Sequence, residues 1–168
     1  MIFRLTRKLF LLVASMTLTV LAGTALAATT TTTYTVQMTV VASCVIGSAS
    51  TLNFGGSQGV ITTNVDQTST VQVQCTDTTP YNVGFNVGTG AGATVAVRKM
   101  TNAGNTINYS LYSDSGRTTV WGNTVGTDTV AATGNGASQS YTVYGRVPPQ
   151  TTPAPATYSD TITVTVTY

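Results

Sequence analysis

The sequence predicts an all-β domain, and three observations carry that prediction. Apolar and polar residues alternate with a period of two along most of the chain after residue 28. Clusters of Gly, Asn, Asp and Ser interrupt the alternation at short intervals, as turns between strands do. No stretch after residue 28 has the spacing of an amphipathic helix. Short strands separated this regularly are typical of a β-sandwich or a β-barrel.

Residues 1–27 have the pattern of a secretory leader. Three basic residues precede an apolar run over residues 9–21, and Ala25 and Ala27 are the small residues that a signal peptidase reads. A retained membrane anchor is the alternative, but Ser and Thr residues interrupt the apolar run. We therefore expect a mature chain that begins at Ala28 and has 141 residues (168 − 27).

Charge is scarce in the expected mature chain. It keeps four of the seven basic residues beside five acidic ones, a net charge of about −1 (4 − 5). No cluster of Lys or Arg remains that would hold phosphates, so a nucleic-acid partner is excluded. One domain of this size can bury a hydrophobic core.

The first element after the leader is an alternating extension over residues 28–43. One face of an extended chain here is apolar, the other is mostly Thr and Gln, and only Val41 breaks the pattern. The residues of the apolar face are Tyr34, Val36, Met38, Val40 and Ala42.

The two cysteines, Cys44 and Cys75, form an even pair in a chain predicted to be exported, so we expect one disulfide between them. An unpaired reactive thiol is the alternative. A bond closing a loop of about 32 residues would stabilise the fold by roughly 3–4 kcal/mol in the entropic model. A disulfide in an all-β chain favours an immunoglobulin-like sandwich.

The remaining strands follow from the same alternation. The clearest candidates are residues 71–75, 81–87 and 161–168, followed by 51–54, 93–100, 107–112 and 141–147. The last candidate runs to the final residue of the sequence, so we expect its outer edge, with Ile162, Val164, Val166 and Tyr168, to lack a partner in the same chain. With so few charges, such an edge has little protection against pairing with another chain.

The residues available for chemistry are few. The sequence has no His and no Glu, which excludes Ser-His-Asp catalysis, histidine-based zinc sites and a pair of catalytic glutamates. The five Asp residues lack the spacing of a calcium loop. Trp121 has the chemistry to stack on a sugar, although a single Trp in a β-domain is more often a core residue. We therefore expect no catalytic, metal or cofactor site.

Several segments resemble the spore coat protein U family. They are Asn108-Tyr-Ser-Leu-Tyr112-Ser-Asp114, Trp121-Gly122, Tyr144-Gly-Arg-Val147 and the terminal Tyr158-Ser-Asp160 with its alternating Thr residues. Cys44, Cys75 and the segment Leu52-Asn-Phe54-Gly55 fall where that family has its paired cysteines and first strands. The resemblance covers nearly the whole expected mature chain.

The resemblance implies a subunit of an archaic chaperone-usher pilus or a related coat-type polymer, exported through the periplasm to the cell surface. Such subunits have an immunoglobulin-like fold that lacks its last strand. A periplasmic chaperone fills the gap until, at an outer-membrane usher, the extension of an identical or homologous subunit replaces it. The resemblance thus implies that residues 28–43 are a donor strand, that residues 44–168 are the acceptor domain, and that the fibre serves adhesion and biofilm formation.

Two alternatives remain open from the sequence. Residues 34–41 can instead be the first strand of a complete, monomeric sandwich, because most strands pair within their own chain. A monomer of that kind would be a secreted binding module, directed at carbohydrate through exposed Tyr residues and Trp121.

Overall fold

In a computed structural model, residues 26–56 and 58–168 are described, so nearly all of the predicted leader lies outside the described residues. The chain divides into two units at Met38 and Thr39, and each is treated by itself. In the first unit, residues 26–38 are exposed and belong to no strand or helix. The second unit contains every strand that the structure describes. No helix of a length and apolarity that could cross a membrane occurs among the described residues.

The second unit is built from strands, which confirms the all-β prediction. They are β1 (Cys44–Ala49), β2 (Val65–Cys75), β3 (Pro80–Phe85), β4 (Arg98–Asn102), β5 (Asn105–Tyr112), β6 (Val130–Thr133), β7 (Ser138–Val147) and β8 (Val164–Thr167).

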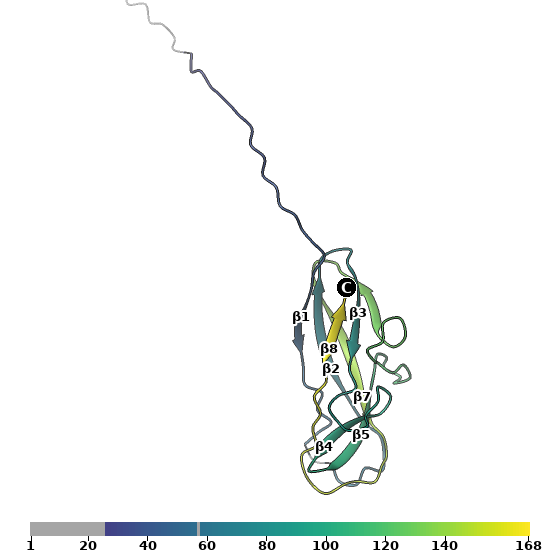
Figure 1. The fold of residues 1–168 in the computed structure, drawn as a ribbon. Coiled ribbons are helices and arrows are strands. Elements are labelled where there is room, and N and C mark those ends of the chain that lie inside the picture. The colour runs from purple at the N-terminus through teal and green to yellow at the C-terminus, as the bar shows by residue number, and fades with distance from the viewer. Residues whose placement is uncertain (1–25, 57) are drawn as a thin grey trace, which may run out of the picture. The chain divides into compact units, whose positions relative to one another are not determined.

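The strands form two sheets, in the order β1-β2-β7-β5-β4 and β6-β3-β8 (Figure 1). All pairings between these strands are antiparallel, and the longest joins β2 to β7 from Val65↔Val147 to Gln74↔Ser138. Alternate residues of each strand face inward, because successive side chains of a strand point to opposite faces. The buried hydrophobic residues are Ile61, Val71, Val73, Cys75, Tyr81, Val83, Phe85, Tyr109, Leu111, Trp121, Val143 and Val147.

A connecting segment around Trp121 joins the two sheets along one side. The backbone N–H of Trp121 donates to Leu111 O in the five-stranded sheet at 2.9 Å, and Gly122 O accepts from Phe85 N in the three-stranded sheet at 2.8 Å. The indole Nε1 of Trp121 donates to Val83 O at 2.8 Å. Trp121 is 1% exposed, so this side of the sandwich is closed by a large apolar side chain whose N–H group is satisfied.

Arg98 stabilises the same side of the sandwich through hydrogen bonds from a buried position. Its side chain is fully buried and donates to four backbone carbonyls, those of Phe85, Asn86, Val95 and Trp121, at 2.7–2.9 Å. Burial lowers the pKa of the guanidinium from its ordinary value, because the charged form loses water. The carbonyl bonds replace that water and tie the loop before β4 to β3.

Some strand boundaries differ from the predicted ones. Residues 51–54 and 93–97 belong to no strand, and β8 begins only at Val164. Leu52 and Phe54 instead pack over Gly145, where a Cβ atom would lie 2.5 Å from a Leu52 methyl carbon. Two strands, β1 and β6, were not predicted, because β1 carries Gly47 at a bulge and β6 contains two Ala residues.

Candidate functional site: an open apolar groove

The second unit has a groove of about 1090 Å³ whose lining includes Ala49 at the end of β1 and Val164 at the start of β8. Its apolar lining comes from both sheets and from the loops before β2 and β8, and includes Leu52, Phe54, Ile61, Val71, Phe85, Met100, Ile107, Tyr109, Leu111, Val143, Ile162 and Val164. The volume slightly exceeds the roughly 300–1,000 Å³ of small-molecule pockets. A groove of this size and lining suits an apolar polypeptide segment.

The groove exists because two sheet edges are unpaired. Of the strands that the structure describes, β1 pairs only with β2, and β8 pairs only with β3. Each therefore presents a row of backbone N–H and C=O groups along its outer edge. The two strands terminate different sheets on the same side of the sandwich, as Figure 1 shows, so both edges border one opening.

Core-facing residues of these edge strands remain exposed. Ile46 of β1 lies opposite Val73, which is fully buried, yet Ile46 is 42% exposed. Val166 of β8 lies opposite the fully buried Val83, yet is only partly buried. Because paired residues in an antiparallel register face the same way, Ile46 and Val166 point inward without being fully covered. The hydrophobic core is therefore open on this side.

A hydrogen-bond network centred on Asp160 fixes the segment that precedes β8 beside the groove. The Tyr109 hydroxyl donates to Asp160 Oδ2 at 2.7 Å, and Asp160 Oδ1 accepts from Thr89 N, Thr89 Oγ1 and Thr161 N at 2.7–2.8 Å. Gly88 permits this contact, since a Cβ atom there would overlap the Asp160 carboxylate. Burial, and then the bond to Asp160, raises the pKa of Tyr109 far above its ordinary value, so Tyr109 remains a donor.

The predicted acceptor edge is only partly a strand. Val164 and Val166 lie in β8, and Ile162 precedes it; all three pack against the core, and Ile162 and Val164 line the groove. Tyr168 follows the strand and is 61% exposed. Loop residues 50–56, 58, 59 and 152–161 also line the groove. Residues 51–54 were predicted as a strand, and residues 152–157 were assigned no role because their Pro, Ala and Thr residues carry no alternation.

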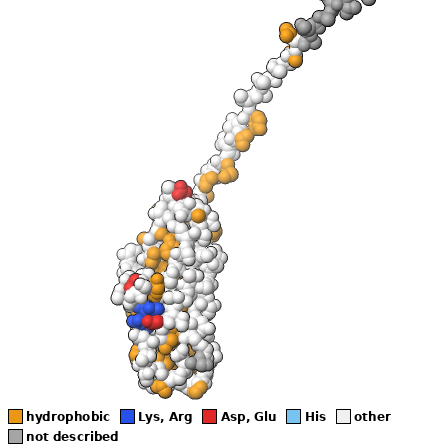
Figure 2. Space-filling view, turned by 180° about the vertical axis from the view of Figure 1, so that it is seen from behind, with side chains coloured by type: hydrophobic (Ala, Val, Ile, Leu, Met, Phe, Trp, Pro, Cys, Tyr) orange, Lys and Arg blue, Asp and Glu red, His pale blue; other side chains and the backbone are white. Residues whose placement is uncertain are grey.

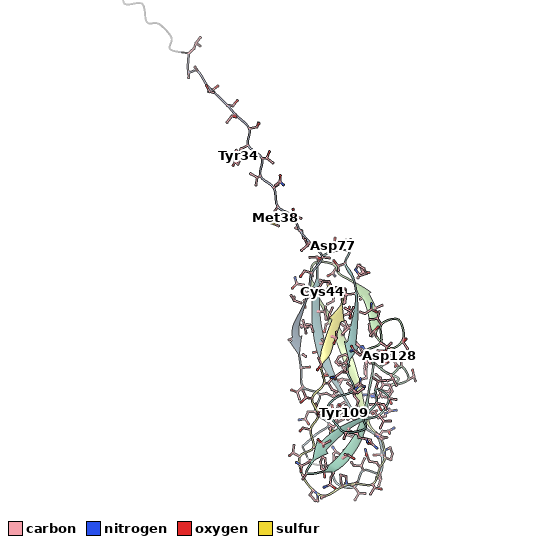
Figure 3. The ribbon with its side chains drawn as sticks, viewed as in Figure 1. Tyr34, Met38, Cys44, Asp77, Tyr109 and Asp128 are labelled. Carbon is pink, nitrogen blue, oxygen red and sulfur yellow. A yellow bond between two sulfur atoms is a disulfide. The ribbon has the colours of Figure 1, made fainter. Side chains whose placement is uncertain are left out.

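The predicted donor residues belong to no strand. Tyr34, Val36 and Met38 in the first unit are 80–85% exposed, and Figure 3 shows Tyr34 and Met38 on an extended stretch of chain. In the second unit, Val40 is 69% exposed and Ala42 is also exposed. The first strand of the sandwich is β1, so residues 34–41 are not the first strand that the monomeric alternative requires.

Cys44 and Cys75 form the predicted disulfide. They are directly paired residues of β1 and β2, so the bond attaches the edge strand β1 to its neighbour where the extension ends. Cys44 lies beside Asp77 at one end of the second unit (Figure 3). Because β1 is largely exposed and pairs with one strand only, the disulfide is a main anchor of this groove wall.

Trp121 does not offer a ring to a sugar. It is 1% exposed and packs edge-to-face against Phe85, with ring centroids 4.7 Å apart. The suggestion that it stacks on carbohydrate is therefore wrong, and its usual place in a β-domain, the core, is the one observed. Within the described residues, no three His, Cys, Asp or Glu side chains lie together as a metal site would require.

The comparison with protein families decides the relationship. The model of the Spore Coat Protein U domain matches residues 30–165, which is most of the chain. The chain belongs to this family. Protein U of Myxococcus xanthus is 38% identical over 139 residues, which cover 74% of this chain and 77% of that protein.

A solved structure of similar fold has a TM-score of 0.56 and 28% sequence identity. It is the CsuC–CsuE chaperone–tip adhesion subunit pre-assembly complex from archaic chaperone-usher Csu pili of Acinetobacter baumannii. The match covers 77% of this chain but only 40% of the matched chain, so this chain spans less than half of that length. The Spore Coat Protein U domain described here is thus an immunoglobulin-like β-sandwich.

The residues behind the family resemblance have structural roles in this Spore Coat Protein U domain. Trp121 closes one side of the core, and Gly122 lacks the Cβ atom that would overlap Asp128. Gly145 admits Leu52 and Phe54, and Asp160 fixes the approach to β8. These motif residues therefore hold the sandwich together and shape the chain beside the groove.

Proposed function

We propose that this protein is a structural, non-catalytic subunit of a secreted surface fibre, an archaic chaperone-usher pilus or a coat-type polymer, assembled by donor-strand complementation. In this proposal residues 1–27 are the leader, residues 28–43 the donor strand and residues 44–168 the acceptor domain. One observation carries it: between two unpaired strand edges, the inward-facing Ile46 is 42% exposed and the inward-facing Val166 is only partly buried.

The extension has the chemistry that the groove requires. Its apolar face is Tyr34, Val36, Met38, Val40 and Ala42, at the two-residue spacing that places side chains on one face of a strand. Inserted between β1 and β8, its backbone would bond to both edges while this face enters the core. Burying four large apolar side chains would stabilise the contact by about 6–12 kcal/mol before ordering costs.

The geometry of exchange favours a fibre over a closed dimer. The donor and acceptor are different surfaces of the same chain, so the contact is heterologous and need not close on itself. Identical or homologous subunits would be joined in this way, each contributing one extension and one groove. The disulfide between Cys44 and Cys75 would hold the edge strand β1 ready for the incoming strand.

The open groove is also the reason to expect partners during export. A domain with an uncovered core needs temporary cover during export. We propose a periplasmic chaperone for that role and an outer-membrane usher as the place of exchange, with the finished fibre on the cell surface. The similarity to one chain of a chaperone–tip adhesion subunit complex supports the chaperone. Adhesion and biofilm formation are the proposed roles of the fibre.

The decisive experiment separates the two faces of the extension. Val36→Asp with Met38→Asp places two charges on the apolar face, and Thr35→Asp with Gln37→Asp places the same two charges on the polar face. We expect the apolar-face variant to lose the high-mass, SDS-resistant oligomers and the polar-face variant to keep them. A synthetic peptide of residues 29–43 should bind the apolar-face variant and prevent its aggregation.

Deletion of residues 28–42 with the leader retained gives a second test. The proposal requires the truncated domain to depend on the added peptide for stability. A truncated or apolar-face variant that is a stable monomer without peptide, and whose parent chain is also a monomer, would overturn the proposal and favour a monomeric secreted module. The adhesive role is checked separately, by surface attachment of cells that carry the apolar-face variant.

A further inference from the structure

A second feature, distinct from the groove, lies on the outer face of the five-stranded sheet. Two arginines, Arg117 and Arg146, meet Asp66 there beside the rings of Tyr112 and Tyr144. We call these five residues the Arg-Tyr patch. In Figure 2 the basic side chains of this face gather at one spot, with an acidic side chain against them.

The strand register brings the patch together. Asp66 of β2 lies opposite Arg146 of β7, and Tyr144 of β7 lies opposite Tyr112 of β5. Tyr144 and Arg146 are two residues apart, so both point outward, whereas Val143 and Val147 are buried. Arg117 comes from the loop after β5, and its guanidinium carbon lies 5.7 Å from the Tyr144 ring centroid, within cation–π range.

The patch carries more positive than negative charge. Arg146 binds Asp66 through Nε and Nη2, both at 2.8 Å, and Arg117 Nε is 3.4 Å from the same carboxylate. Two guanidiniums thus share one carboxylate, which leaves a net charge of +1. The Arg117 and Arg146 side chains are 13% and 28% exposed, so this charge is partly withdrawn from water but still accessible.

Many donors of the patch have no protein acceptor in the described structure. Two guanidiniums have ten N–H groups, and four of these bond to Asp66, Gly145 O and Ser115 O, which leaves six (10 − 4). Guanidinium groups present their donors in a planar fork that matches a carboxylate. The open donors therefore suit a second, external carboxylate beside Asp66.

The loop that carries Arg117 is rigid and strained. Arg117 has a φ of 55°, a left-handed conformation that is uncommon for a residue with a side chain. The Asp114 carboxylate holds the loop by accepting from Thr118 N, Thr118 Oγ1 and Thr119 N, and Arg117 N donates to Asp114 O. Backbone strain of this kind is often retained at binding sites. Here it sets the guanidinium over the Tyr144 ring.

We infer that the Arg-Tyr patch binds a carboxylate-bearing polysaccharide, a chain of uronic acid units. The guanidiniums would pair with one sugar carboxylate, and the adjoining Tyr rings would contact the apolar faces of neighbouring sugars. A single net charge is too small to hold a polyphosphate, whose binding rests on many ion contacts. The inference goes beyond the fibre proposal and does not depend on assembly.

Binding is tested with the leader-processed full chain and immobilised polygalacturonate, with neutral dextran and dextran sulfate as comparison surfaces. We expect binding to polygalacturonate but not to dextran. Arg117→Gln should weaken this binding at least tenfold. Lys99→Gln removes the same charge outside the patch, so its binding should be unchanged. Tyr112→Thr keeps every charge and should weaken binding severalfold, which guards against misfolding of the Arg117 variant.

Three results would overturn the inference. The first is absence of polygalacturonate binding by the parent chain, in which case the patch is a structural ion cluster or a protein contact. The second is equal weakening by Arg117→Gln and Lys99→Gln, which would indicate general charge attraction. The third is stronger binding to dextran sulfate that Tyr112→Thr does not affect. The apolar-face variant of the extension should retain polygalacturonate binding, so this test and the assembly test fail independently.

Discussion

The hydrophobic core is covered on one long side of this sandwich and left open on the other. On the closed side, the segment around Trp121 bonds to both sheets, and Arg98 donates to four carbonyls beneath it. On the open side, β1 and β8 face a groove with unpaired edges and uncovered apolar residues. The core is therefore exposed along the side that β1 and β8 border. Because the segment around Trp121 ties the two sheets together on one side, the other side can remain open without the sheets separating.

The largest expected effect is on the closed side. Trp121→Ala removes a buried indole together with its hydrogen bond to Val83 O, and should lower the free energy of unfolding by about 3–5 kcal/mol. Urea denaturation of the processed chain measures this. A loss below about 1.5 kcal/mol would mean that Trp121 does not close this side in the way described.

A matched pair of valines compares the two sides directly. Val83 and Val166 are cross-strand partners, but only Val83 is fully buried. Val83→Ala should cost about 2 kcal/mol, and Val166→Ala about half as much or less, because fewer contacts and less burial are lost.

Added donor peptide should change the stability cost of Val166→Ala but not that of Val83→Ala. When a peptide of residues 29–43 covers the groove, the cost of Val166→Ala should rise toward that of Val83→Ala, while the Val83→Ala cost stays constant. Denaturation with and without excess peptide, in the chain carrying Val36→Asp and Met38→Asp, measures both. Equal costs without peptide would show that Val166 is already covered.

The smallest expected effect is the loss of stability at low pH when Asp66 is protonated. The hydrogen bond from Arg146, followed by the charges of Arg117 and Arg146, holds the pKa of Asp66 below its ordinary value of 3.8 despite some desolvation. A lowered pKa means that the stabilisation is complete above about pH 4 and is lost as pH falls through the lowered pKa. For a surface ion pair it amounts to about 0.2–1 kcal/mol.

Asp66→Asn isolates this contribution. The variant should be slightly less stable than the parent at neutral pH, and the difference should shrink as pH falls below about 4. Thermal unfolding between pH 2 and 7 measures the difference. Peptide binding to the groove should not depend on Asp66, since Asp66 is absent from the groove lining. A groove affinity that changes with Asp66→Asn would show that the two faces are coupled.

The residue pattern alone was enough to predict the fold class and the disulfide. Alternation with a period of two requires strands, and β2, β3, β5 and β7 were predicted because their side chains alternate between core and solvent. The pairing of Cys44 and Cys75 followed from their number and the predicted export. The alternation of residues 34–42 was equally visible, as was the core-facing pattern of Ile162, Val164 and Val166.

The position of the opening in the core depends on how the strands are ordered in the two sheets. Alternation shows which face of a strand is apolar but not what covers it, so Val83 and Val166 look alike in the sequence. Their difference arises from strand order, which places β1 and β8 at the ends of two sheets and Trp121 on the opposite side. The same holds for Arg117, Arg146 and Asp66, which are far apart in the chain and meet because strand register and one strained loop bring them together.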